Sequence, residues 1–164
     1  MKLTMLGTGN ASVTKCYNTC FTLSEGNEYF LIDGGGGNGI LRILEEENIP
    51  MTSIHHVFVS HGHTDHVLGI IWILRIIAQG MHKGSYEGNL NVYCHKELKE
   101  MLDVICNMML PKKFLKFFGN RILFTEVIDG QEEEILGCKV RFMDLISPKM
   151  KQFGFVLEKE DKKL

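Results

Sequence analysis

One short stretch restricts the possible folds more than any other feature of the chain. The residues from Ser60 to His66 read SHGHTDH and place three histidines and one aspartate within six positions. They follow a short apolar run, Val57–Val59, and precede a long one, Val67–Ala78. Polar side chains between two core elements indicate a strand-to-helix turn, which is where folds often present binding and catalytic groups.

The same residues have the chemistry of a metal site. Imidazole nitrogens and carboxylate oxygens together suit zinc or a similar divalent first-row metal, such as Mn²⁺ or Fe²⁺. On an irregular turn, residues two apart can point the same way, so His61 and His63 can bind one ion. Asp65 and His66 follow closely enough to bind a second. The alternative is a polar loop that is rich in histidine by chance, and the order of the four residues makes this the weaker interpretation.

The spacing HxHxDH from position 61 to position 66 resembles the signature of the metallo-β-lactamase fold. Two earlier segments, Leu3–Gly9 and Tyr29–Gly35, are also similar to this superfamily, and in particular to its ribonuclease Z-like branch. The resemblance covers the chain from residue 1 to about residue 158. It implies an α/β fold, the αββα sandwich, and a metal-dependent hydrolase as the function. The signature specifies the fold more closely than the substrate.

The resemblance also implies a reaction and a substrate class. In the family mechanism a metal-bound hydroxide attacks a phosphodiester or ester, and Asp65 would orient or deprotonate the water. The ribonuclease Z-like branch implies an endoribonuclease acting on RNA, with tRNA precursor 3′ ends as the leading substrate. A small phosphodiester or ester stays open. A two-metal zinc site is expected. Asp33 has two interpretations: it opens a glycine-rich turn, or it holds a histidine ligand from behind.

Part of the family's ligand set has no counterpart in this sequence. Family members add a third histidine after a later strand, and an aspartate and a histidine from the second half of the sandwich. Here the third-histidine position falls on Ile146, which cannot bind metal, and no later aspartate–histidine pair follows. The resemblance therefore implies a truncated fold: one mixed sheet with helices on one face and the other face exposed. Such a face favours a homo-oligomer or a covering partner. Two alternatives to the hydrolase follow, a catalytically incompetent member and an interaction subunit.

Hydrophobic periodicity supports the α/β class. The sequence predicts helices over residues 38–48, 67–79 and 96–110, and strands over residues 2–6, 19–24, 29–32, 54–60, 90–94, 121–124, 134–136, 139–145 and 153–158. Trp72 is predicted to lie in the core or at an interface. The run Lys112–Phe118 mixes lysine with phenylalanine and could stack bases and neutralise phosphates. We interpret it instead as an amphipathic connector whose lysines extend to solvent.

Length and composition place these elements in one domain. The 164 residues are enough for a single core, which we assign to residues 1–158, with a charged tail at 159–164. The net charge of −2 gives no global attraction to nucleic acid or to an anionic membrane. The apolar run after position 66 is shorter than the roughly 20 residues that span a bilayer. The five cysteines are scattered, and no signal-peptide pattern is present. We therefore expect free thiols and a cytoplasmic location.

Overall fold

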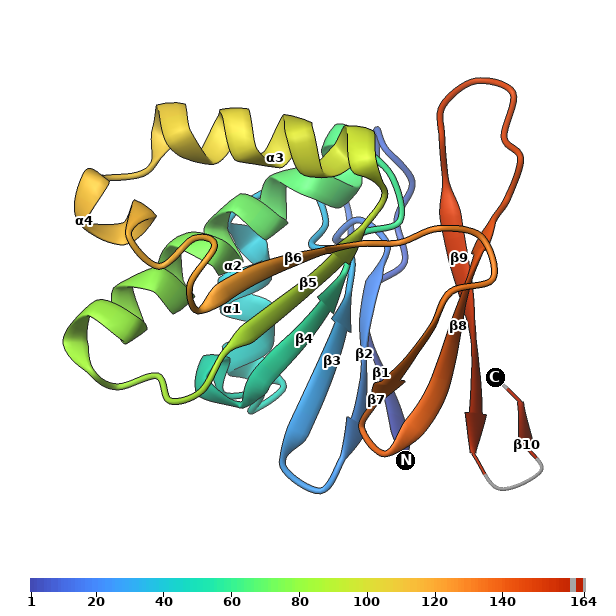
Figure 1. Cartoon of the computed structure of the whole chain (residues 1–164), viewed down its shortest axis with the longest axis horizontal. Helices are drawn as coiled ribbons and strands as arrows, with labels where there is room; N and C mark the ends of the chain where they lie inside the picture. The colour runs from blue at the N-terminus through green and yellow to red at the C-terminus, as the bar shows by residue number, and fades with distance from the viewer. Residues whose placement is uncertain (160–161, 164) are drawn as a thin grey trace.

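The computed structural model describes residues 1–159, 162 and 163 (Figure 1). Its helices are α1 (Gly39–Glu46), α2 (Thr64–Lys83), α3 (Lys96–Met109), α4 (Lys112–Leu115) and the short 3-10 helix η1 (Met51–Ser53). Its strands are β1 (Lys2–Gly7), β2 (Cys20–Glu25), β3 (Glu28–Ile32), β4 (Ile54–Phe58), β5 (Leu90–Cys94), β6 (Ile122–Glu126), β7 (Glu132–Ile135), β8 (Cys138–Asp144), β9 (Phe153–Lys159) and β10 (Lys162–Lys163).

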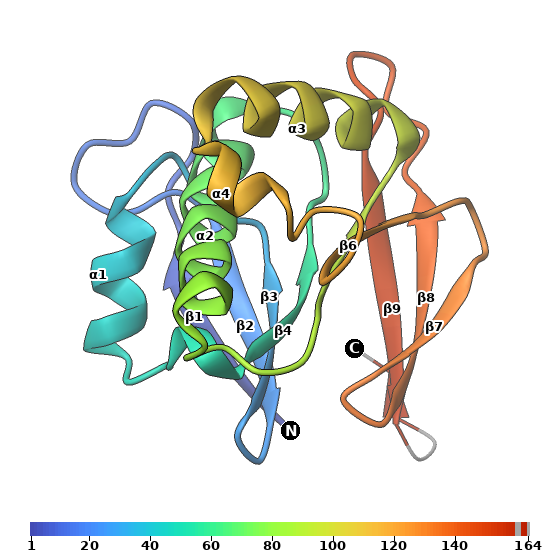
Figure 2. The same cartoon turned by 60° about the vertical axis from the view of Figure 1, so that its left-hand side comes forward.

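The first sheet contains β1 to β6, and their order in space is their order in the chain. The first three strands pair antiparallel, whereas β3, β4, β5 and β6 pair parallel. Parallel neighbours need a crossover connection, and the helices supply one for each parallel pair. Because such crossovers share one hand, all the helices lie on the same face of the sheet (Figures 1 and 2). The predicted mixed sheet with helices on one face is confirmed.

The second sheet is the main difference from the sequence-based expectation. Strands β7 to β10 form a four-stranded antiparallel sheet of their own beside the first sheet (Figure 1). Aromatic side chains pack between the two sheets: Phe58 lies 5.4 Å from Phe142, and Phe30 lies 5.5 Å from Phe155, between ring centroids. The expectation of a single sheet with one exposed face was therefore wrong. Strands after β6 pair with one another and place their apolar side chains against the first sheet, which removes the reason for a partner on that face.

Helix α2 begins earlier and ends later than predicted. It runs over Thr64–Lys83 instead of 67–79, so Asp65 and His66 lie in its first turn. The helix stops at Gly84, which has a left-handed φ of 76°. Glycine adopts this conformation without the steric cost that other residues carry, so it ends the helix. The signal for the helix end was therefore Gly84 and not the last apolar residue.

A close backbone contact fixes the start of α2 against the loop after β3. The Gly34 amide donates to the His66 carbonyl at 2.9 Å, and the Gly69 amide donates to the Gly35 carbonyl at 2.9 Å. A Cβ atom on Gly69 would lie 1.8 Å from the Gly34 oxygen, so only glycine allows this approach. Because parallel strands end at the same edge of a sheet, the contact brings the loops after β3 and β4 together there.

The chain end limits one prediction. Residues 160, 161 and 164 of the expected charged tail lie outside the described residues, while Lys162 and Lys163 form β10 and pair with β9. The domain boundary at 158 stays a prediction. Over residues 1–159 and 162–163, we find no helix with both the length and the apolar character needed to cross a bilayer.

Candidate metal centre

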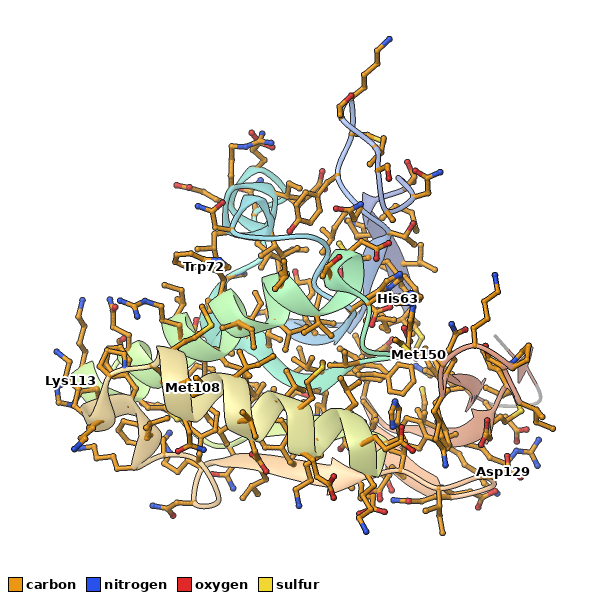
Figure 3. All side chains as sticks on the ribbon, turned by 90° about the horizontal axis from the view of Figure 1, so that it is seen from above. His63, Trp72, Met108, Lys113, Asp129 and Met150 are labelled. Atoms are coloured by element: carbon orange, nitrogen blue, oxygen red, sulfur yellow. The ribbon has the colours of Figure 1, made fainter. Side chains whose placement is uncertain are left out.

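The predicted ligands converge where β3 and β4 end. Nε2 of His61 lies 3.0 Å from Nδ1 of His63. Each metal–nitrogen bond is about 2.0–2.1 Å long, so two nitrogens at this separation can both reach one ion with little adjustment. Figure 3, which looks down on this edge, labels His63 near the start of α2 and Trp72 further along the same helix. The strand therefore delivers this pair as the sequence predicted.

The second predicted pair adjoins the first. Oδ2 of Asp65 lies 3.5 Å from Nε2 of His66, which is too long for a hydrogen bond and compatible with two ligands of one ion. The ring of His66 also packs against His61, with 4.1 Å between centroids. The four side chains thus form one cluster, which we call the donor cluster: His61, His63, Asp65 and His66.

Asp33 lies behind the donor cluster and is 6% exposed. Its Oδ2 accepts a hydrogen bond from Nδ1 of His66 at 2.7 Å, so the other ring nitrogen, Nε2, faces Asp65. A carboxylate behind a ligand histidine is the usual way to orient such a ring. Asp33 also has a φ of 56°, in the left-handed region that aspartate tolerates better than most residues. Both interpretations of Asp33 are compatible with this position, since it also begins the glycine turn.

Ser60 is a polar residue of this network that sequence reasoning missed. Its backbone amide donates to Oδ1 of Asp33 at 2.8 Å, and its hydroxyl donates to Oδ2 of Asp33 at 2.7 Å. The same hydroxyl oxygen lies 2.9 Å from Nδ1 of His61. A hydroxyl residue at the end of an apolar strand, directly before the first histidine, was the available signal. Asp33 therefore contacts His66 directly and His61 through Ser60.

The network shifts the pKa values of His61 and His66 in opposite directions. Burial is the largest influence on His61 and lowers its pKa, with a further lowering from the neighbouring His66. Burial also acts to lower the pKa of His66. The hydrogen bond that His66 donates to Asp33 and the charges of Asp33 and Asp65 outweigh burial and raise that pKa overall. The neutral form that binds metal is therefore favoured at His61.

The donor cluster fits a divalent metal ion in type and orientation but not in number. The contacts of His61 with Ser60 and of His66 with Asp33 occupy Nδ1 of each ring. Nε2 of each ring faces the cluster, where Nε2 of His61 is within hydrogen-bond distance of His63. Among residues 1–159, 162 and 163, however, no three His, Cys, Asp or Glu side chains are placed to hold one ion together. Catalytic zinc usually has three protein ligands. Two protein ligands per ion are fewer than this, so other groups would have to complete the coordination of each ion.

The position expected for a third histidine lies in the loop between β8 and β9. The end of this loop meets the turn after β4, since the amide of Phe153, the first residue of β9, donates to the Ser60 carbonyl at 3.0 Å. Ile146 is 86% exposed and has a φ of 51°. A β-branched residue in the left-handed region is strained. An exposed, strained isoleucine supplies no metal ligand here.

Two further histidines and the run Lys112–Phe118 have structural roles in the described chain. Nδ1 of His56 contacts the Tyr93 hydroxyl at 3.2 Å, and Nδ1 of His95 accepts from the Leu98 amide at 3.4 Å at the start of α3. In the run Lys112–Phe118, two of the three phenylalanines, at 114 and 117, are buried, whereas the three lysines are exposed. The connector interpretation is therefore confirmed, since these two rings are not available to stack bases.

Comparison with known proteins identifies relatives of this chain. The family model described as "Anti-Pycsar protein Apyc1" matches residues 1–146. The chain is 40% identical over 110 residues to the ribonuclease Z of Methanococcus maripaludis strain C7, a match that covers 66% of this chain and 33% of that protein. The chain thus spans about a third of the length of such curated relatives.

Solved structures show the same fold at low sequence identity. The short form of human tRNase Z superposes with a TM-score of 0.70 and 18% identity, over 99% of this chain and 67% of that one. The metallo-β-lactamase fold protein YhfI from Bacillus subtilis gives a TM-score of 0.73 and 18% identity, over 98% of this chain and 60% of that one. At this identity the likeness establishes the fold and nothing finer.

Proposed function

The chain belongs to the family of the anti-Pycsar protein Apyc1 and is a ribonuclease Z-like member of the metallo-β-lactamase superfamily, and on that basis we propose that it is a metal-dependent phosphodiesterase. One observation carries the proposal. Two nitrogens of the donor cluster, on His61 and His66, face inward because Ser60 and Asp33 occupy the other nitrogen of each ring. These two nitrogens are therefore already oriented in a way that suits metal binding.

Each residue of the cluster has a part in the proposed reaction. His61 and His63 would hold one divalent ion, and Asp65 and His66 a second. A bound divalent ion supplies a reactive hydroxide near neutral pH and a positive charge near the developing oxyanion. Asp65 would accept the proton of the attacking water and orient that water, since its carboxylate has no hydrogen bond to His66 at their 3.5 Å separation. Zinc is the proposed metal, with Mn²⁺ or Fe²⁺ as alternatives.

RNA is the proposed substrate class, by analogy with the ribonuclease Z relatives, and a small phosphodiester or ester is the alternative. Two observations favour the smaller substrate. The net charge is −2, which gives no general attraction to a polyanion. The phenylalanines at 114 and 117 are buried and so cannot act as a stacking platform.

Hydrolysis assays test the proposal directly. Purified protein would be offered a tRNA precursor and, separately, bis-p-nitrophenyl phosphate, before and after metal removal. We expect cleavage that chelation abolishes, that added Zn²⁺ or Mn²⁺ restores, and that Asp65→Ala eliminates. Thr64→Ala is the matched control, because this side chain is exposed in the same turn. Full activity in the metal-stripped protein would refute the proposal, and the preferred substrate would decide between RNA and a small phosphodiester.

A second candidate is a catalytically incompetent member of the family or an interaction subunit. The observation in its favour is that each ion finds two ligands among the described residues and that Ile146 replaces the expected histidine. This candidate predicts a turnover no greater than that of Asp65→Ala at every metal concentration. Metal-dependent turnover above that level would exclude it.

The surface that we propose for a homo-oligomer differs from the exposed sheet face that the sequence suggested. Helix α2 presents an apolar stripe, Leu68, Trp72 and Ile76, and Leu68 and Trp72 are 42% and 38% exposed. Arg75 lines the hollow beside Trp72, and Glu45 lines the hollow beside Ile76. Opposite charges on a shared apolar surface can pair reciprocally between two copies related by a two-fold axis. We propose that a second copy packs on this stripe.

Light scattering at micromolar concentration tests the oligomer. We expect a dimer for the natural chain and a monomer for Trp72→Glu, which introduces a charge into the stripe. Ile128→Glu is the control, because that exposed side chain lies outside α2. A natural chain that is monomeric throughout would contradict the proposal.

A cytoplasmic location is the last proposal. Cys16, Cys20, Cys94 and Cys106 are free thiols, and burial raises the pKa of the last three to about 12 each. Thiols of this kind persist in a reducing compartment. Fluorescence imaging of the tagged chain in its host would test the location, and an exported pool would contradict it.

A further inference from the structure

The Ser60 hydroxyl has a fixed direction. Both side-chain oxygens of Asp33 accept hydrogen bonds from Ser60, Oδ1 from the backbone amide and Oδ2 from the hydroxyl. The single hydroxyl hydrogen of Ser60 therefore points to Oδ2 of Asp33, 2.7 Å away. The Ser60 oxygen is left to accept, and its remaining neighbour is Nδ1 of His61 at 2.9 Å. That nitrogen must then carry a proton.

We propose that Ser60 is a positioning residue that fixes the proton of His61 on Nδ1. The ring nitrogen that carries the proton in a neutral histidine is set by the hydrogen bonds of its surroundings. With the proton on Nδ1, the lone pair of His61 lies on Nε2, the atom that is 3.0 Å from His63. Ser60 thereby keeps the neutral His61 imidazole in the form whose lone pair, on Nε2, faces the cluster and can bind a metal ion.

One carboxylate thus controls two histidines by two routes. Asp33 accepts directly from Nδ1 of His66 at 2.7 Å, so His66 needs no serine. His61 is linked to Asp33 through the Ser60 hydroxyl, and its Nε2 contacts Nδ1 of His63. Removal of that hydroxyl should move the ring proton of His61 and leave the ring proton of His66 on Nδ1. A general loss of packing would not produce this pattern.

The inference deepens the proposed function, because it explains how one metal ligand is prepared, and in this respect it rests on that function. The proton position itself is a property of the metal-free protein. It can therefore be measured whether or not the chain cleaves any phosphodiester.

Nitrogen-15 NMR of the metal-free protein at about pH 8, where free imidazole is neutral, tests the proton position. We expect the natural chain to carry the His61 proton on Nδ1. Ser60→Ala should move it to Nε2, the nitrogen that free imidazole side chains prefer, and Ser60→Thr, which keeps the hydroxyl, should leave it on Nδ1. His66 should keep its Nδ1 proton in every variant. A natural chain with the His61 proton on Nε2 would overturn the inference without any need for a variant.

Zinc affinity, measured by competition with a chromogenic chelator, gives the second readout. Loss of a group that orients a ligand histidine typically weakens metal binding about 10-fold or more, and we expect this for Ser60→Ala. Ser60→Thr and the control Thr64→Ala should bind zinc as the natural chain does. Equal affinities for Ser60→Ala and the natural chain would count against the inference. If the NMR result holds but no substrate is cleaved, only the proposed function fails.

Discussion

Replacing Asp33 with asparagine tests the network in depth. Asp33 accepts three hydrogen bonds, from the Ser60 amide at 2.8 Å, the Ser60 hydroxyl at 2.7 Å and His66 at 2.7 Å. Asparagine has nearly the same shape and also tolerates the left-handed φ of 56°, so backbone strain does not change. The substitution therefore removes the charge and one acceptor and changes little else.

The expected loss follows from those bonds. The asparagine amide nitrogen is a donor and would face groups that also donate, so two of the three bonds are lost. A hydrogen bond to a charged group contributes about 1.5–3 kcal/mol. His66 is only partly buried and can move its proton to accept from the amide, which recovers part of the loss. We expect Asp33→Asn to lower the free energy of unfolding by about 3 kcal/mol.

Urea unfolding in the presence of a chelator, at about pH 7.5, measures this loss without a contribution from metal. Asp129→Asn is the matched control, because exposed Asp129 accepts one hydrogen bond from the Asp144 amide at 3.0 Å. The control should lose less than about 1 kcal/mol. If the two substitutions had equal effects, the reasoning on the buried network would be refuted.

Three further predictions use other parts of the structure. The pKa of His66 is raised on folding, so its stabilising contribution is present below the unfolded pKa of about 6.5 and is lost as the pH rises through the folded pKa. The difference in unfolding free energy between the natural chain and His66→Gln should therefore shrink between pH 6 and pH 9 in metal-free protein. A constant difference would contradict this prediction. Gly69→Ala places a Cβ 1.8 Å from the Gly34 oxygen and should cost about 3 kcal/mol or more, whereas Gly37→Ala meets nothing within 4 Å and should cost less than about 1 kcal/mol; similar melting temperatures would refute the close contact. Ile146→Asn relieves the backbone strain of a φ of 51° at an exposed site and should raise the unfolding free energy by about 1 kcal/mol in urea titration. An unchanged unfolding free energy would contradict the argument that Ile146 is strained.

Local chemistry allowed much of the site to be predicted. The order of His61, His63, Asp65 and His66 in a strand-to-helix turn predicted that they would converge, and they form one cluster. One of the two interpretations of Asp33 placed it behind a histidine, and its side chain contacts His66. Whether the cluster holds metal stays a prediction. The proximity of these side chains could be predicted because the residues involved are close in sequence or follow neighbouring strands of one sheet.

Two of the errors share a physical cause, since each depended on contacts between distant segments. Periodicity identified β7, β8 and β9 as strands but carries no information on which strands pair, so the second sheet was not foreseen. Ser60 reads as the end of an apolar strand until Asp33, 27 positions earlier, is placed beside it. The start of α2 was misplaced because its first turn consists of polar cluster residues in place of apolar ones.

Metal content per chain, measured by mass spectrometry on protein purified without chelators, tests the central claim most directly. The natural chain and Thr64→Ala should carry about one zinc-like ion or more per chain, and His63→Ala and Asp65→Ala should each carry clearly less. Metal far below one ion per chain in the natural protein, unchanged in the variants, would contradict the account of the donor cluster as a metal centre.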